Sequence, residues 1–294
     1  MVNQVQQFCD YIQHQKRYSH HTVTAYKNDL EQFIQYALHA FAVNEWSEIN
    51  TSIIRSWIVA LIEEGNTSTT INRKISSLKS LYKYMLKNSL VATNPLLKVV
   101  VPKTSKRLPV FVNENEISQL FSAIEFKDTF EGQRDKLIME LFYLTGIRLS
   151  ELMNLKVSDV NTYNLSIKVL GKRNKERVIP ITNEFIKLFQ NYLIYRSEIS
   201  TDSNYVFLTE RGEKIYEKLV YRIVNNYLSL VTTVGKKSPH VIRHTFATHM
   251  LNRGAELNTI KEILGHASLS ATQVYTHNTI EKLKTIYKQA HPRA

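Results

Sequence analysis

Residues 238–249 of this chain read Ser-Pro-His-Val-Ile-Arg-His-Thr-Phe-Ala-Thr-His. Ser238 is a favoured N-cap residue and proline is favoured at the first helical position, so this pair predicts a helix over 239–252. The unpaired backbone N–H groups of the first turn would favour an anion beside His240. Because His240 and Arg243 are three residues apart, they lie on one face of the helix. The stretch therefore predicts a helix that presents a histidine and an arginine to a negatively charged group.

Around this helix, the second part of the chain mixes helical and strand patterns. Apolar residues at helical spacing predict further helices over roughly 114–124, 132–145, 150–155, 182–197, 213–231, 256–264, 268–276 and 279–290. Segments 165–170 and 177–181 alternate apolar and polar residues on either side of Gly171-Lys-Arg-Asn-Lys-Glu, which predicts a β-hairpin with a basic tip. This part is therefore expected to form an α+β domain.

The first part of the chain has only helical patterns. They cover about 3–16, 22–41, 51–63 and 68–87, and four helices with short joints are typical of a small bundle. Pro102 and Pro109 then break regular structure, and three basic side chains between them keep the segment in solvent. We therefore expect a helical domain over 1–102, a basic linker over 103–110 and a second domain over 111–294. The fold class that follows is mainly α with a small β-sheet.

The chain of 294 residues carries a formal net charge of +12. Before Pro102 there are 10 Lys and Arg against 7 Asp and Glu, and after it 28 against 19, so the two parts carry +3 and +9. A basic surface favours a polyanionic partner such as nucleic acid. Charge alone does not exclude the plainer alternative, which is solubility, because many basic proteins bind no nucleic acid.

Several classes of protein are disfavoured by what the chain lacks. Cys9 is its one cysteine, so an intramolecular disulfide and a cysteine-based zinc site are excluded, and a reducing cytosol is favoured. The N-terminus has no basic segment followed by an apolar run, which indicates no signal peptide. No uninterrupted apolar run reaches about 18 residues, so no membrane span is expected. We therefore expect a cytoplasmic protein.

One face of the predicted helix 68–87 carries basic and polar side chains without any acidic one. Such a face is most often only solvated, but a solvated helix usually mixes charges of both signs, whereas a face of one sign suits phosphates along a groove. Basic residues here, in the linker and at the hairpin tip are therefore candidate DNA contacts. They are Arg73, Lys74, Lys79, Lys106, Arg107 and Arg173.

Four short stretches in the second part contain residues suited to phosphate chemistry. They are Thr145-Gly-Ile-Arg-Leu-Ser-Glu-Leu, Gly171-Lys-Arg-Asn-Lys, Pro239-His-Val-Ile-Arg-His-Thr-Phe-Ala-Thr-His, and Leu264-Gly-His-Ala-Ser-Leu-Ser-Ala-Thr-Gln-Val-Tyr-Thr-His. Each stretch alone is weak, since a lone arginine or lysine is usually a surface residue and the chain has 16 tyrosines. In order, they give the set Arg148, Lys172, His240, Arg243, His266 and Tyr275.

This ordered set and its flanking residues resemble the tyrosine recombinase family, also called phage integrases, and within it the Xer-type site-specific recombinases. The likeness covers nearly the whole chain, from His21-Thr-Val-Thr-Ala-Tyr-Lys-Asn-Asp-Leu to His291-Pro-Arg-Ala. Two small departures are Ile242, where the family commonly has leucine, and Ile147 in a hydrophobic position. The resemblance implies a SAM-like core-binding domain at the N-terminus and an α+β catalytic domain after it.

The reaction that the resemblance implies explains the arginines. A phosphodiester passes through a five-coordinate transition state with extra negative charge on its non-bridging oxygens. Arg148 and Arg243 supply planar donors that stay charged, and His266 adds another hydrogen bond. Glu151 is expected to position Arg148 or to cap a short helix.

The remaining members of the set move protons and form the covalent bond. Tyr275 is implied as the nucleophile, and because a tyrosine hydroxyl ordinarily ionises near pH ~10 it needs a base, for which His240 is expected. Lys172 is expected to protonate the 5′ oxygen that leaves, so that a phosphotyrosine joins the protein to the 3′ end. The scheme needs no cofactor and no metal. His244 and His249 share the helix of Arg243 and are expected to be structural.

The resemblance also implies partners. They are duplex DNA with a dif-like site, a homo- or hetero-tetramer at synapsis, and, for chromosome dimer resolution, a second Xer recombinase and a DNA translocase of the FtsK type near the bacterial nucleoid. Three alternatives stay open: a phage or transposon integrase, a type IB topoisomerase, and a DNA-binding protein without catalysis. An apolar stripe near the C-terminus, Ile280, Leu283, Ile286 and Tyr287, packs either on its own domain or, as the resemblance implies, into a neighbouring protomer.

Overall fold

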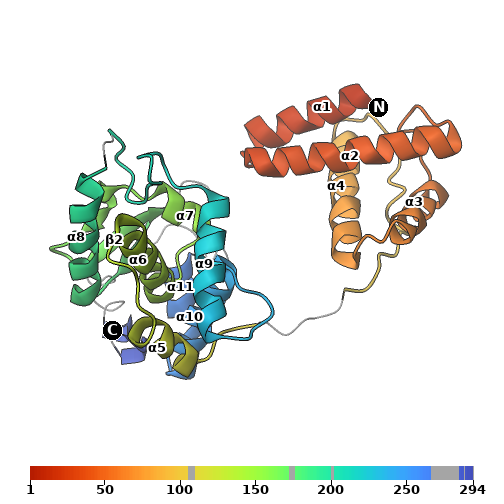
Figure 1. The fold of residues 1–294 in the computed structure, drawn as a ribbon. Coiled ribbons are helices and arrows are strands. Elements are labelled where there is room, and N and C mark those ends of the chain that lie inside the picture. The colour runs from red at the N-terminus through yellow and green to blue at the C-terminus, as the bar shows by residue number, and fades with distance from the viewer. Residues whose placement is uncertain (105–109, 172–175, 200–201, 266–284, 288, 294) are drawn as a thin grey trace. The chain divides into compact units, whose positions relative to one another are not determined.

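The chain divides into two compact units, Met1–Arg107 and Leu108–Ala294 (Figure 1). Each unit has a hydrophobic core of its own. The computed structural model describes residues 1–104, 110–171, 176–199, 202–265, 285–287 and 289–293. None of the described helices has both the length and the apolar character that a membrane span requires. The expected helix 268–276 and most of the hairpin tip lie outside the described residues.

The first unit is built from helices. They are α1 (Val2–Asp10) with a π-helical turn (Tyr11–Gln15), α2 (His20–Phe41), α3 (Thr51–Glu63) and α4 (Ser68–Lys87). Side chains of Ser19, Asn50 and Thr67 cap the last three of these by accepting backbone N–H groups, which is why they begin where they do. The four predicted helices are thereby found, except that the first one changes to π geometry after Asp10.

The second unit combines helices with one small sheet. Its elements are α5 (Glu114–Ser122), α6 (Phe130–Thr145), α7 (Leu149–Asn154), a 3-10 turn (Val157–Asp159), β1 (Val160–Asn161), β2 (Ser166–Leu170), β3 (Glu176–Pro180), α8 (Asn183–Ser197), α9 (Glu217–Val231), α10 (Pro239–Asn252) and α11 (Leu257–Leu264). Strands β2 and β3 pair antiparallel, with Lys168 opposite Val178, as the hairpin pattern predicts. The short strand β1 was not predicted, and α9 begins four residues later than predicted because Lys214 instead bridges to Leu208.

Helix α6 runs through the core of the second unit and sets the position of the segment after it. It is buried on nearly every side from Leu137 to Thr145, and helices α8 and α10 pack against it. Gly146 ends the helix with a left-handed φ of 57°, and a Cβ there would lie 2.6 Å from Phe246 Cδ1. The close packing of α6 on α10 therefore requires glycine here, and it places Arg148 two residues beyond the helix end.

The described part of the chain end packs on its own unit. Tyr287, Ala290 and His291 are buried in the core of the second unit, and Arg293 forms an ion pair with Glu140 at 2.8 Å. Of the apolar stripe, Ile286 and Tyr287 thus pack on their own unit in this structure, whereas Ile280 and Leu283 lie outside the described residues. Docking of this stripe into a neighbouring protomer stays a prediction.

Candidate active site

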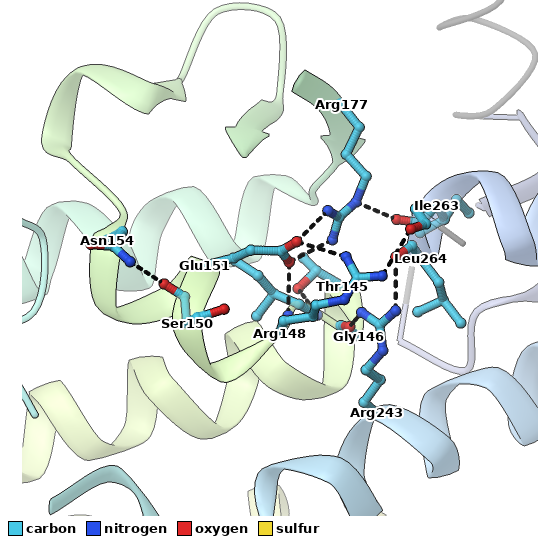
Figure 2. Close-up of polar contacts among 12 residues, drawn as sticks. Thr145, Gly146, Arg148, Ser150, Glu151, Asn154, Arg177, Arg243, Ile263 and Leu264 are labelled. Carbon is cyan, nitrogen blue, oxygen red and sulfur yellow. Dashed lines mark hydrogen bonds and ion pairs between the residues drawn. The ribbon is translucent and has the colours of Figure 1, made fainter. Parts of the chain in front are cut away.

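Three arginines from three separate elements meet at the C-terminal end of α11 (Figure 2). Their donors reach the carbonyl oxygens of three consecutive residues, 263 to 265. Arg177 Nε lies 2.8 Å from the first oxygen, Arg243 Nη2 2.7 Å from the second and Arg148 Nη2 2.8 Å from the third. The last carbonyls of a helix lack helical partners and carry partial negative charge, so cations are stabilised beside them. The helix end therefore holds the three guanidinium groups together.

Glu151 lies at the centre of this arginine cluster and has a side chain only 2% exposed. Arg177 donates Nη1 to Oε1 at 2.6 Å and Nη2 to Oε2 at 2.7 Å. Arg148 donates its backbone N–H to Oε2 at 2.9 Å and its Nη1 to Oε1 at 2.8 Å. The expectation that Glu151 either positions Arg148 or caps a short helix is confirmed in both forms, because one carboxylate does both.

The charges of the cluster explain how a buried carboxylate stays ionised. Burial raises the pKa of Glu151, but the hydrogen bonds and charge of Arg177, followed by those of Arg148, outweigh burial and leave that pKa below its ordinary value. Three guanidinium groups face this one carboxylate, so the cluster keeps an excess of positive charge. Such a surplus is suited to an anion.

Arg243 lies on α10 and joins two helix ends. It donates Nη1 to the carbonyl of Gly146, at the end of α6, and Nη2 to the carbonyl of Leu264, in α11. Burial, and then the charges of Arg148 and Arg177, lower the pKa of Arg243 to about 9, so it remains protonated at pH 7. This guanidinium is therefore fixed in place and charged.

His240 occupies the first turn of α10 and is exposed. The helix begins as predicted, with Ser238 at the N-cap and Pro239 at the first position, so His240 and Arg243 share a face. Lys172, His266 and Tyr275 lie outside the described residues. In sequence, however, His266 directly follows Gly265, whose carbonyl is bound by Arg148.

The expected DNA contacts of the first unit differ in their surroundings. Lys79 is exposed on α4. Arg73 has a half-exposed side chain and pairs with the buried Asp29 of α2. Lys74, also predicted as a DNA contact, has a side chain that is only 11% exposed, and its Nζ binds Asp29 at 3.4 Å as well as Gln32. A buried carboxylate requires such partners, so Lys74 belongs to the interior.

The other expected positions lie partly within and partly outside the described residues. Lys106, Arg107 and Arg173 lie outside the described residues. His249 is buried and its Nδ1 lies 3.0 Å from the hydroxyl of Tyr143, which confirms a structural role. Within the parts of the chain that the structure describes, no group of three or more His, Cys, Asp and Glu side chains could hold a metal ion.

Arg177 was not among the expected site residues. It lies on β3, where Arg177 and Ile179 are buried and Val178 between them is half-buried. Arg177 therefore takes an inward position of the strand. A strand that places a charged residue in its apolar register needs a buried partner of opposite charge. That irregularity in the alternation is the signal by which the sequence could have indicated Arg177.

Two segments of the chain match known families. Residues 110–282 match the phage integrase family, and residues 5–88 match the phage integrase N-terminal SAM-like domain. A tyrosine recombinase XerC of Thermodesulfovibrio yellowstonii is 39% identical over 291 residues, which cover 97% of this chain and 95% of that protein. A tyrosine recombinase XerC of Staphylococcus aureus is 38% identical over 298 residues, covering 100% and 98%.

Solved structures of similar fold include DNA complexes. XerH site-specific recombinase bound to a palindromic difH substrate gives a TM-score of 0.72 at 20% identity and covers 100% of this chain and 82% of its own. The Tn1549 transposon integrase in complex with transposon right end DNA gives 0.75 at 20% identity, covering 96% and 98%. At this identity the likeness is one of fold.

Proposed function

Because this chain belongs to the phage integrase family and is a site-specific tyrosine recombinase, we propose that it cuts and rejoins duplex DNA through a covalent bond between Tyr275 and a 3′ phosphate. The observation that carries the proposal is the arginine cluster, in which Arg148 and Arg243 are fixed beside one helix end with positive charge in excess. The proposed catalytic residues are Arg148, Lys172, His240, Arg243, His266 and Tyr275.

Arg148 and Arg243 bind the non-bridging oxygens of the phosphate that is cut. Their hydrogen bonds to backbone carbonyls hold both guanidinium groups before DNA arrives, so little reorganisation is needed as charge develops. Donors fixed in this way stabilise the transition state more than the ground state, which is what accelerates the reaction. His266 supplies a further hydrogen bond to the same oxygens.

The bond changes balance without any added reactant. The hydroxyl oxygen of Tyr275 attacks phosphorus, and its proton passes to His240, which is exposed in the first turn of α10. The bond from phosphorus to the 5′ oxygen breaks, and Lys172 protonates that oxygen. Rejoining is the reverse reaction with a different 5′ hydroxyl. One phosphodiester replaces another, so no ATP is consumed.

We propose that the DNA partner is a dif-like site and that the reaction resolves chromosome dimers in the bacterial cytoplasm, at the nucleoid. Relatives named tyrosine recombinase XerC are 38–39% identical to this chain over nearly its full length, which supports this role. The transposon integrase is only 20% identical. Four protomers would assemble at synapsis, together with a second Xer recombinase if the tetramer is mixed. A DNA translocase of the FtsK type would then supply activation.

A nicked duplex tests the chemistry directly. When a nick close to the cleavage position lets the short 5′-hydroxyl strand diffuse away, rejoining fails and the covalent adduct accumulates. Wild-type protein is expected to form an adduct on the 3′ end, and Tyr275→Phe none. Absence of an adduct in wild type, with DNA binding retained, would instead indicate a DNA-binding protein without catalysis. Sequencing the DNA attached to the protein in cells distinguishes one chromosomal dif-like site from mobile-element ends.

A further inference from the structure

We propose that Arg177 is a positioning residue for strand cleavage, which acts through Glu151 and the end of α11 without touching DNA. The inference rests on the proposed function, because it assigns Arg148 to the phosphate. Arg177 is 4% exposed, so DNA cannot reach its guanidinium. Its role must be exerted through the groups that it binds.

The guanidinium of Arg177 binds two different elements. Both of its Nη atoms bind the two oxygens of Glu151, on α7, and its Nε binds the carbonyl of Ile263, on α11 (Figure 2). A planar fork of this kind fixes distance and orientation together, which a lysine cannot do. Arg177 therefore holds α7 and α11 in one geometry from β3.

The charge of Arg177 determines what Glu151 does to Arg148. Glu151 Oε1 lies 2.8 Å from Arg148 Nη1, and a lone carboxylate there would cancel most of the field that Arg148 directs at a phosphate. Arg177 contacts the same oxygen at 2.6 Å and supplies a second positive charge. Glu151 is thereby able to orient Arg148 while the pair of arginines keeps a net positive charge.

The contact with α11 places the chain before His266. Arg177 binds the carbonyl of Ile263, and its side chain also lies against Gly265, where a Cβ would come 3.1 Å from Arg177 Cδ. Gly265 accepts a hydrogen bond from Arg148. Arg177 thus fixes both the last turn of α11 and the residue that precedes His266 in sequence.

The test compares Arg177→Met with a matched control, Arg134→Met, in the full chain. Arg134 has the same exposure of 4% at its side chain, pairs with Asp135 and donates to the carbonyl of Leu208, so it is an equally buried arginine in an ion pair outside the arginine cluster. On the nicked duplex, Arg177→Met is expected to lower the single-turnover rate of adduct formation about 100-fold with the Kd for DNA within about threefold. Arg134→Met is expected to keep the rate per folded molecule.

Two further measurements exclude a merely structural role. Arg177→Lys keeps a positive charge near Glu151 and replaces the methionine variant in the test if that variant does not fold. It is expected to form the adduct about tenfold more slowly than wild type. A methylphosphonate at the cleavage position replaces a charged non-bridging oxygen, so Arg148 has less charge to balance. The ratio of the rates of adduct formation by wild type and by Arg177→Lys should therefore be smaller on that substrate than on ordinary DNA.

The variant Glu151→Gln completes a cycle with Arg177→Met. If Arg177 acts through Glu151, the double variant is expected to be no slower than the slower single variant by more than about threefold. Three outcomes would each overturn the inference and leave the proposed function intact. The rate losses of the two single variants could multiply in the double variant, the rate ratio of wild type to Arg177→Lys could stay the same on methylphosphonate DNA, or DNA affinity could fall as much as the rate does. Failure of wild type to form any adduct, judged beside Tyr275→Phe, would overturn both.

Discussion

Arg148 and Arg243 donate to the carbonyl oxygens of adjacent residues at the end of α11, the first to Gly265 at 2.8 Å and the second to Leu264 at 2.7 Å (Figure 2). Arg148 is the N-cap residue of α7 and Arg243 lies on α10, so the two arginines are far apart in sequence. A single helix end therefore acts as their common template, and whatever shifts that end shifts both guanidinium groups together.

Replacing either arginine by lysine is expected to preserve charge but lose this template. Lysine has no planar fork, so it cannot hold a helix-end carbonyl and a phosphate in the same fixed geometry. Arg148→Lys and Arg243→Lys should each slow adduct formation by about 10²- to 10³-fold in single-turnover assays at saturating DNA. Arg196→Lys is the matched control, because Arg196 also donates to backbone carbonyls, those of Ser203 and Tyr205, away from the cluster. A rate within a few-fold of wild type for both cluster variants would contradict the assignment.

Replacing Gly146 by alanine is expected to destabilise the second unit. Gly146→Ala meets a left-handed φ of 57° and places Cβ 2.6 Å from Phe246 and 2.7 Å from Leu264, so unfolding by urea should show a loss of roughly 2–5 kcal/mol. Gly254→Ala has φ of 84° and meets no atom within 4 Å, so only the backbone cost of roughly 1–2 kcal/mol is expected. If the two variants lose the same free energy of unfolding, Phe246 moves away from the added Cβ without a loss of stability.

Lys79 and Lys74 are expected to differ in DNA binding although both belong to the basic residues of α4. Lys79 is exposed, so Lys79→Met should weaken binding to duplexes of any sequence and reduce the slope of log Kd against log salt by about 1. Lys74→Met removes a charge that already pairs with Asp29 inside the unit, so its salt slope should stay that of wild type. Titrations at several salt concentrations measure both, and a reduced slope for Lys74→Met would show that Lys74 does reach phosphate.

The sequence could indicate the helices because each buries a periodic apolar stripe, and it could indicate the start of α10 because the Ser238-Pro239 pair fixes a backbone geometry. Local patterns of this kind depend on neighbours a few residues away. The short strand β1 was not predicted because two residues are too few to show an alternation of apolar and polar side chains. The interior place of Lys74 escaped because its partner, Asp29, lies on a different helix.

The candidate site was predicted unevenly for the same reason. Short sequence motifs indicate Arg148, His240 and Arg243. The carbonyl groups that hold the arginines belong to the backbone, so the residue types do not indicate them. Arg177 contacts Glu151 across 26 positions of sequence, and only its inward place on β3 breaks a pattern. Pairings between distant elements are what the fold adds to the motif.

His291 anchors the chain end in a form that should make stability depend on pH. Its Nε2 donates to the carbonyl of Tyr143 at 3.1 Å and its Nδ1 accepts the backbone N–H of Arg293 at 3.1 Å, which is the hydrogen-bonding pattern of a neutral ring. The ring also stacks on Tyr287 at 4.9 Å. Burial, above all, lowers the pKa of His291 from its ordinary 6.5 to about 4.

The sign of the effect follows from proton binding. Between pH 6.5 and about 4 the unfolded chain takes up a proton at His291 and the folded chain does not, so acidification in this window favours unfolding. The free energy of unfolding should therefore fall by about 2 kcal/mol from this residue between pH 7 and pH 5, at about 1.4 kcal/mol per pH unit below 6.5. His291→Gln keeps a donor for Tyr143 but cannot take up a proton, so urea unfolding at the two pH values should show a smaller loss in that variant than in wild type. Equal pH dependence in the two proteins would mean that the folded state admits a charged His291, and that the chain end is held by the packing of Tyr287 rather than by the neutral imidazole.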